Sequence, residues 1–200
     1  MTKGEATRDA IVLKALELAG EVGLESLSLG VLALSLELSK SGLFAHFKSK
    51  EALQLAVLEE AIERFTARVI LPALSAPRGE PRVRALFERK LAWMENSGFG
   101  KGCFFMSLTQ EFDDRPGVIR DRLLQSQRDF HGVIEKAVTL AIREKHFASN
   151  IEPAQFAFEL DGITSAYQQA YKLFDDRHAK ARALRAFERL VVDCQLKKKN

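Results

Sequence analysis

The stretch that decides the fold is Leu38 to Lys50, which reads Leu-Ser-Lys-Ser-Gly-Leu-Phe-Ala-His-Phe-Lys-Ser-Lys. Ser39 is a good N-cap for a short helix, and Ser49 is one for the longer helix that follows. Leu43 and Phe47 lie one turn apart on the same helical face and can anchor the short helix to a core. Isolated helices below roughly 12 residues are marginal in water. We therefore expect neighbouring helices to hold this one, and its polar side to have a use.

The rest of the chain is also expected to be helical. Leu, Ala, Glu, Lys and Arg dominate, and no Asn-Gly or Asp-Gly hairpin is flanked by alternating β-branched residues. Either Ser26 or Ser28 caps the second helix, and Pro72 is expected to end the fourth. The apolar periodicity predicts an all-α fold of about nine helices, over residues 7–22, 28–35, 39–46, 50–71, 81–94, 103–112, 118–145, 153–174 and 177–195.

The composition limits the class of protein. A length of 200 residues gives enough chain for a real core, and a net charge of +3 is far from that of a nucleic-acid coating protein but permits a local basic footprint. Two cysteines without framework spacing indicate a reducing compartment. The N-terminus has no apolar signal core, and no run approaches the ~18 apolar residues of a membrane span. We expect a cytoplasmic protein.

The helix, turn and short second helix between Ser28 and Phe47 are typical of a helix-turn-helix motif, whose second helix reads the major groove of DNA. A preceding helix that stops at Gly23 and a long helix that starts directly after the motif make the pattern more specific. Together these features resemble the tetracycline-repressor (TetR) family of bacterial transcription regulators. The matching residues are Thr7-Arg8, Ala15-Leu16-Glu17-Leu18, Gly23, Ser28, Ala33, Ser39-Lys40, Leu43, Phe47 and Ser49-Lys50-Glu51-Ala52-Leu53.

The resemblance implies a three-helix DNA-binding domain over residues 1–50 and a ligand-binding and dimerisation domain over residues 51–200. It implies a homodimer that binds a palindromic operator in double-stranded DNA. Four residues are expected to hold phosphates, namely Ser28, Lys40, His46 and Lys50. Four others on the recognition helix are expected to face the bases, namely Ser41, Gly42, Phe44 and Ala45.

The sequence departs from the family pattern in three places. Gly30 stands where a polar residue often contacts DNA, and Gly42 replaces a frequent Thr in the recognition helix. Glu37 replaces the usual glycine of the turn, and a residue with a Cβ in a left-handed conformation costs on the order of 1 kcal/mol. Few base-reading side chains remain, so the predicted interface is rich in phosphate contacts and poor in base contacts.

Aromatic and thioether side chains are frequent in the middle of the chain. Most of them are expected to be plain core, yet a flexible Gly-containing loop followed by Cys-Phe-Phe-Met suits the wall of an apolar pocket, which the resemblance also implies. The residues predicted to contact a small apolar effector are Phe65, Trp93, Phe104, Phe105, Met106, Phe130 and Phe158.

The last two helices carry more apolar residues than one inner face needs. This resembles the dimer interface of the family, a four-helix bundle with two helices from each subunit, whereas the simpler alternative is packing within one subunit. The predicted interface residues are Tyr167, Tyr171, Leu184, Phe187, Leu190 and Val191.

The sequence therefore predicts a ligand-responsive repressor, with an all-α protein-binding adaptor or an enzyme without a recognisable motif as the alternatives. No catalytic or metal-binding residue and no cofactor is predicted. His131 and Glu135 are spaced for a shared metal but have no evident third ligand. Cys103 follows Gly102 at a helix start, where a redox role competes with simple packing. The effector and the operator sequence cannot be read from the chain.

Overall fold

The computed structural model describes residues 3–195, without the side chains of Lys3 and Lys40, and it is helical, as predicted. The helices divide into two compact units, of which the first comprises residues 3–64 and 97–126 and the second residues 65–96 and 127–195. The predicted division at residue 50 separates a DNA-binding part from a part that binds effector and dimerises. It stays a prediction. The segment around residues 97–126 belongs to the same unit as the N-terminal helices because it packs against them.

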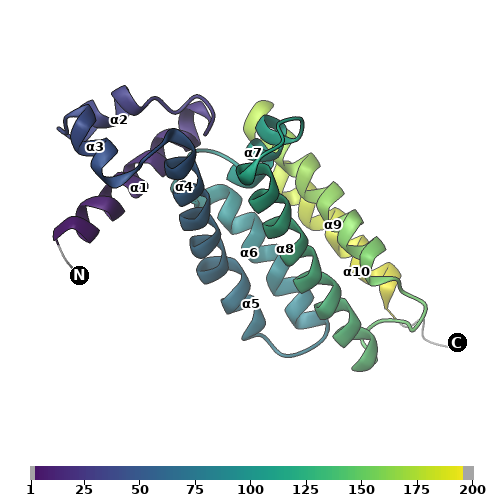
Figure 1. Ribbon diagram of the computed structural model, residues 1–200. Helices are drawn as coiled ribbons and strands as arrows, with labels where there is room; N and C mark the ends of the chain where they lie inside the picture. The colour runs from purple at the N-terminus through teal and green to yellow at the C-terminus, as the bar shows by residue number, and fades with distance from the viewer. Residues whose placement is uncertain (1–2, 196–200) are drawn as a thin grey trace, which may run out of the picture. The chain divides into compact units, whose positions relative to one another are not determined.

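The first unit is built around the helix-turn-helix. Its helices are α1 (Lys3–Val22), α2 (Leu29–Ser35), α3 (Lys40–His46), α4 (Lys50–Phe65, of which Phe65 belongs to the second unit), α7 (Phe104–Phe112) and the beginning of α8 (Val118–Arg143) (Figure 1). Its core is formed by the apolar faces that the periodicity predicts. The fully buried members include Ile11, Leu16, Leu24, Leu32, Leu43, Leu53 and Val57.

Three glycines in this unit allow close approaches that a side chain would prevent. A Cβ at Gly20 would overlap the carbonyl oxygen of Phe99, and one at Gly100, whose φ is +89°, would lie 2.8 Å from the carbonyl oxygen of Gly20. At Gly23, which ends α1 with a φ of +87°, a Cβ would lie 2.8 Å from a carboxylate oxygen of Glu111. The loop before α7 therefore lies directly on the backbone of α1.

The second unit contains the remaining helices. They are η1 (Thr66–Ile70) and η2 (Gln169–Leu173), which are π-helical, and α5 (Leu71–Leu74), α6 (Glu80–Asn96), the larger part of α8, α9 (Pro153–Gln168) and α10 (Ala179–Cys194). Within this unit α9 and α10 run antiparallel and pack on each other (Figure 1). Within residues 3–195, no helix is long and apolar enough to cross a membrane.

The expectation that Pro72 ends the fourth helix is wrong. The helical path continues through η1 into α5, which ends at Leu74 and has Pro72 in its first turn. The N–H of Leu71 donates to the carbonyl oxygen of Thr66, which is the wider spacing of a π-helix. Because the first turn of a helix does not need the N–H that proline lacks, the proline is accommodated there.

The predicted strain at the turn between α2 and α3 is confirmed, since Glu37 has a φ of +55°. We expect Glu37→Gly to increase the free energy of unfolding by about 1 kcal/mol, because glycine adopts this conformation without a steric cost. The control is Glu63→Gly at an exposed position inside α4, which should destabilise by a similar amount. Urea unfolding followed by circular dichroism measures both changes. A loss of stability in Glu37→Gly would show that the turn is not strained.

Candidate nucleic-acid interface

The helix-turn-helix is held by serine caps at each of its helix starts. The Val31 N–H donates to Ser28 Oγ at 3.4 Å at the start of α2, and the Gly42 N–H donates to Ser39 Oγ at 3.0 Å at the start of α3. Ser49 accepts from the Ala52 N–H at 3.0 Å where α4 begins. These bonds satisfy donors that a helix start leaves open, and they fix the ends of the three helices.

The recognition helix α3 has one buried and one exposed side. Leu43 and Phe47 are buried, with 0% and 3% of their surface exposed, so the predicted anchor of the helix is confirmed. Ser41, Phe44 and Ala45 are exposed, and Phe44 alone keeps 46% of its surface accessible. The side chain of Lys40 lies outside the described part of the chain. Among the described side chains of α3, the exposed ones are thus one hydroxyl and two apolar groups, which offer little hydrogen-bonding capacity.

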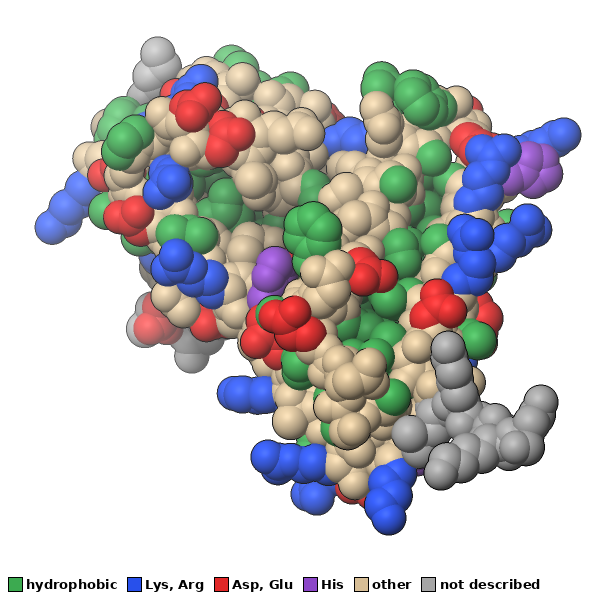
Figure 2. Space-filling model, turned by 90° about the vertical axis from the view of Figure 1, so that its right-hand side faces the viewer, with side chains coloured by type: hydrophobic (Ala, Val, Ile, Leu, Met, Phe, Trp, Pro, Cys, Tyr) green, Lys and Arg blue, Asp and Glu red, His purple; other side chains and the backbone are tan. Residues whose placement is uncertain are grey.

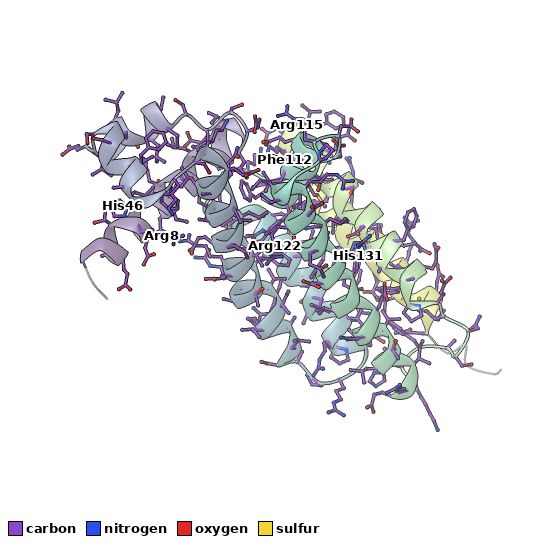
Figure 3. The ribbon with its side chains drawn as sticks, viewed as in Figure 1. Arg8, His46, Phe112, Arg115, Arg122 and His131 are labelled. Atoms are coloured by element: carbon purple, nitrogen blue, oxygen red, sulfur yellow. The ribbon has the colours of Figure 1, made fainter. Side chains whose placement is uncertain are left out.

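Arg8 lies next to the recognition helix and was not among the predicted contact residues. Its guanidinium carbon lies 5.0 Å from the centre of the Phe47 ring, a cation–π contact between α1 and the end of α3. Arg8 and His46 are labelled in Figure 3. Arg8 is exposed and His46 is half-buried. Arg8 could have been predicted as a further DNA contact, because the Thr7-Arg8 pair is among the residues that match the family pattern.

The half-buried side chain of Lys50 is bound to the turn between α1 and α2 rather than free at the start of α4. Its ammonium donates to the carbonyl oxygen of Glu25 and lies 3.8 Å from the Glu25 carboxylate. Gln54, one turn further along α4, donates to the carbonyl oxygen of Leu24 at 3.0 Å and to the Glu25 carboxylate at 3.2 Å. The side chain of Lys50 remains 40% exposed. Lys50 therefore ties the α1–α2 turn to α4, and its phosphate contact stays a prediction.

The same turn is held from the other side by α7 and the loop behind it. Glu111 accepts the backbone N–H of Glu25 at 3.0 Å, and the Arg115 guanidinium lies 3.3 Å from the Glu25 carboxylate. Two chain segments that lie 86 residues apart thus meet at one residue. Of the residues that contact Glu25, only Lys50 was singled out in the sequence, and there as a phosphate contact.

The residues predicted to contact an effector fall into two groups. In the second unit, Phe65 lies edge-on to Trp93 at 5.4 Å and to Phe130 at 5.0 Å between ring centres, and all three are buried. In the first unit, Phe104 and Phe105 are buried, with ring centres 6.2 Å apart, and Met106 is half-buried. Phe158 does not belong to either group, because 72% of its surface is exposed on α9.

A polar cluster that the sequence does not indicate lies beside the first of these groups. Lys90 on α6 is buried and donates to Asp161 of α9 at 2.9 Å, and its ammonium lies 5.1 Å from the Phe130 ring centre. His131 of α8 forms an ion pair with the other oxygen of Asp161. The missing third ligand argues against a metal shared by His131 and Glu135, and His131 pairs instead with a carboxylate on another helix.

The pKa values of this cluster follow from its contacts. Burial raises the pKa of Asp161, but the hydrogen bond from His131 and the charge of Lys90 outweigh it and lower the pKa to about 2. The hydrogen bond to Asp161 raises the pKa of His131 against the opposing effect of burial, and the charge of Glu135 adds to the rise while that of Lys90 opposes it. Asp161 is therefore ionised throughout the physiological range, whereas His131 gains a proton more readily than a free imidazole.

Most of the predicted interface residues pack within the subunit. Tyr167 donates to Glu95 at 3.1 Å, and Phe187 stacks on Phe87 at 3.9 Å between ring centres. Leu190 and Val191 are also buried, while Leu184 is 40% exposed and Tyr171 is half-buried. The exposed apolar residues of this region are Phe158, Leu173, Phe174, Leu184 and Val192. Figure 2 shows apolar side chains reaching the surface on this side of the molecule, with lysines and arginines along its edge.

Comparisons with known proteins agree with this geometry. A family model described as bacterial regulatory proteins, tetR family, matches residues 11–57, and one described as tetracyclin repressor-like, C-terminal domain, matches residues 79–187. A search of curated protein sequences gives no match.

Solved structures share the fold at low sequence identity. A TetR transcriptional regulator from Chloroflexus aurantiacus is 20% identical, with a TM-score of 0.85 over 96% of each chain. A TetR-family regulator from Cytophaga hutchinsonii is 17% identical, with a TM-score of 0.86 over 99% of each chain. AibR, whose structure contains isovaleryl coenzyme A and operator DNA, is 20% identical, with a TM-score of 0.71 over 94% of this chain and 97% of its own.

At these identities the solved structures establish the fold alone, and the family models carry the assignment. One of them covers more than half of the chain, and the other covers the helix-turn-helix whose caps and anchors are described above. The chain belongs to the tetracycline-repressor (TetR) family of transcriptional regulators, which are not enzymes.

Proposed function

We propose that the protein is a homodimeric repressor that binds a palindromic operator and is released from it by a small, largely apolar effector. The observation that carries this proposal is the two-sided recognition helix, with Leu43 and Phe47 buried and Ser41, Phe44 and Ala45 exposed. A short helix anchored in this way can enter the major groove without losing its support. The family membership supplies the class of partner, since its members bind operator DNA and small molecules.

The proposed DNA contacts are of two kinds. Ser28, Lys40, His46 and Lys50 hold phosphates, and we add Arg8, whose guanidinium lies over the Phe47 ring, as a fifth phosphate-binding residue. Ser41, Gly42, Phe44 and Ala45 face the bases. Apolar groups read thymine methyls and exclude water but supply few hydrogen bonds. We therefore expect sequence preference to come partly from DNA shape.

The effector acts by binding one spacing of the two recognition helices better than the other. A ligand with equal affinity for both arrangements would shift nothing, and couplings of this kind are typically worth about 1–3 kcal/mol. The proposed contacts of the effector are the buried aromatic residues of the second unit, Phe65, Trp93 and Phe130. Phe104, Phe105 and Met106 of the first unit stay a separate predicted group.

A gel-shift assay with the genomic DNA that flanks the coding sequence tests the regulatory function. We expect a shifted band that an unrelated fragment does not compete away. Phe44→Ala should weaken this binding by on the order of 1 kcal/mol or more, because it removes the largest base-facing group. Leu34→Ala is the control, since Leu34 is 79% exposed on α2 of the same motif. Equal binding of the flanking and the unrelated DNA would contradict operator recognition.

The role of Lys50 is tested by Lys50→Gln, which keeps a donor for the Glu25 carbonyl oxygen but removes the charge. If the ammonium contacts a phosphate, its loss makes the negative slope of log K against log salt concentration less steep by about 1. Affinity then decreases equally for all DNA sequences. Lys14→Gln, on an exposed ion pair of α1, controls for the change in net charge. An unchanged slope in Lys50→Gln would restrict Lys50 to holding the α1–α2 turn.

The proposed dimer face is the exposed apolar surface of α9, η2 and α10. Replacement of Leu184, which is 40% exposed, by Glu places a charge in that surface and should give monomers, because burying an unpaired charge is costly. Leu71→Glu on α5, where 57% of the side chain is exposed, should leave the dimer intact. Light scattering measures the mass in both cases. A dimeric Leu184→Glu variant would place the interface elsewhere.

A further inference from the structure

A buried lysine in the second unit lies at the edge of an aromatic cluster. Only 7% of the Lys90 side chain is exposed, and its ammonium lies 5.1 Å from the centre of the Phe130 ring. That ring lies 5.0 Å from Phe65, which in turn lies 5.4 Å from Trp93. Lysine is almost never buried unless it is paired, and a buried ion pair is weak evidence for stability. A cation next to three apolar rings matches a ligand with an apolar body and an anionic end.

The ammonium of Lys90 has hydrogen-bonding capacity to spare. An ammonium has three N–H donors, and within residues 3–195 the structure assigns Lys90 one hydrogen bond, to Asp161 at 2.9 Å. The Phe130 ring attracts the ammonium, but it is only a weak hydrogen-bond acceptor. A carboxylate oxygen is the stronger acceptor, and hydrogen bonds between an ammonium and a carboxylate are among the strongest in proteins.

The charge of Asp161 is shared between two helices. Lys90 of α6 binds one of its oxygens and His131 of α8 binds the other. Figure 3 shows His131 on α8, beside α9. When His131 is protonated, it can balance Asp161 by itself, and the charge of Lys90 is then available to another anion. Glu135, one turn along α8, favours this protonated form.

We propose that Lys90 binds the carboxylate of the effector, whose apolar body lies against Phe65, Trp93 and Phe130, while protonated His131 balances Asp161. The effector class is then a small aliphatic or aryl-substituted carboxylic acid. This inference rests on the proposed function, which requires an effector, and it narrows the effector from an apolar molecule to an amphipathic acid. Lys90 is the specificity-determining residue, and protonated His131 makes its charge available by balancing Asp161, which otherwise competes with the effector.

The arrangement makes binding depend on pH. The groups that face His131 are Asp161 of α9, Lys90 of α6 and Glu135 of α8 itself. Because contact with Asp161 raises the pKa of His131 above its ordinary value of 6.5, the protonated form persists to higher pH than in a free imidazole. Carboxylate affinity is therefore greatest between the pKa of the effector acid and that of His131, and it falls as the pH rises through the pKa of His131. Asp161, with a pKa of about 2, stays ionised over this range.

Calorimetric titration of the full-length protein with matched acids and amides tests the proposal. The probes are octanoate with octanamide and 3-phenylpropionate with 3-phenylpropanamide. We expect at least one acid to bind about tenfold or more tightly than its amide. Titrations in buffers of different ionisation enthalpy should show proton uptake at pH values around the pKa of His131, where binding of the acid favours the protonated imidazole. In His131→Gln this uptake disappears.

Two variants separate recognition from folding. Lys90→Met keeps the length of the side chain but removes the charge, so the preference for the acid should be lost. Asp161→Asn removes the competing anion and should strengthen binding of the acid. The thermal unfolding of both variants is compared with that of the parent protein. Asp161→Asn is expected to bind the acid more tightly, which a misfolded protein would not do. The control is Lys180→Met, which removes a cation from an exposed ion pair with Glu95 on the same unit.

The outcomes distinguish this proposal from the regulatory function. Equal binding of acid and amide, no binding of either acid, or an acid preference that survives in Lys90→Met would each overturn the proposal. The gel-shift assay on the same preparations reports DNA binding independently. Loss of operator recognition with an intact acid preference would overturn the regulatory function and retain the site.

Discussion

The recognition helix depends on the burial of two side chains. With seven residues, α3 forms too few internal hydrogen bonds to be stable by itself. Leu43 and Phe47 supply the missing stability by entering the core of the first unit, and Ser39 caps the start of the helix. The proposed base contacts on α3, namely Ser41, Gly42, Phe44 and Ala45, are positioned by this anchor. The other side of the helix does not pack against the core, and Phe44 and Ala45 are exposed there.

The sequence indicates features that depend on neighbours along the chain. Apolar periodicity, serine caps and a terminal glycine are local signals, and the helices they predict are observed. The strained φ of Glu37 was also predictable, because the turn requires a left-handed residue there. Pro72 was misjudged because a π-helical segment before it changes the hydrogen-bonding pattern, and no simple sequence signal marks such a segment.

Features that depend on distant contacts could not be predicted in the same way. Glu111 reaches Glu25 across 86 residues, and Lys90 reaches Asp161 across 71. In the sequence each of these residues is an ordinary charged group on a helix, and only the tertiary packing decides which of them are buried. The same applies to the last two helices. Periodicity shows that Phe187 and Val191 are on an apolar face, but not that this face packs inside the subunit.

The contact between Gly20 and the loop before α7 has a mechanical consequence. Here backbone meets backbone, because a Cβ at Gly20 would overlap the Phe99 carbonyl oxygen. Side chains can absorb a small displacement by changing rotamer, whereas two peptide segments in direct contact cannot. A shift of the loop toward α1 therefore has no side chain in between to take it up. Gly20 thus matters for the position of the loop although it has no side chain that could bind DNA or an effector.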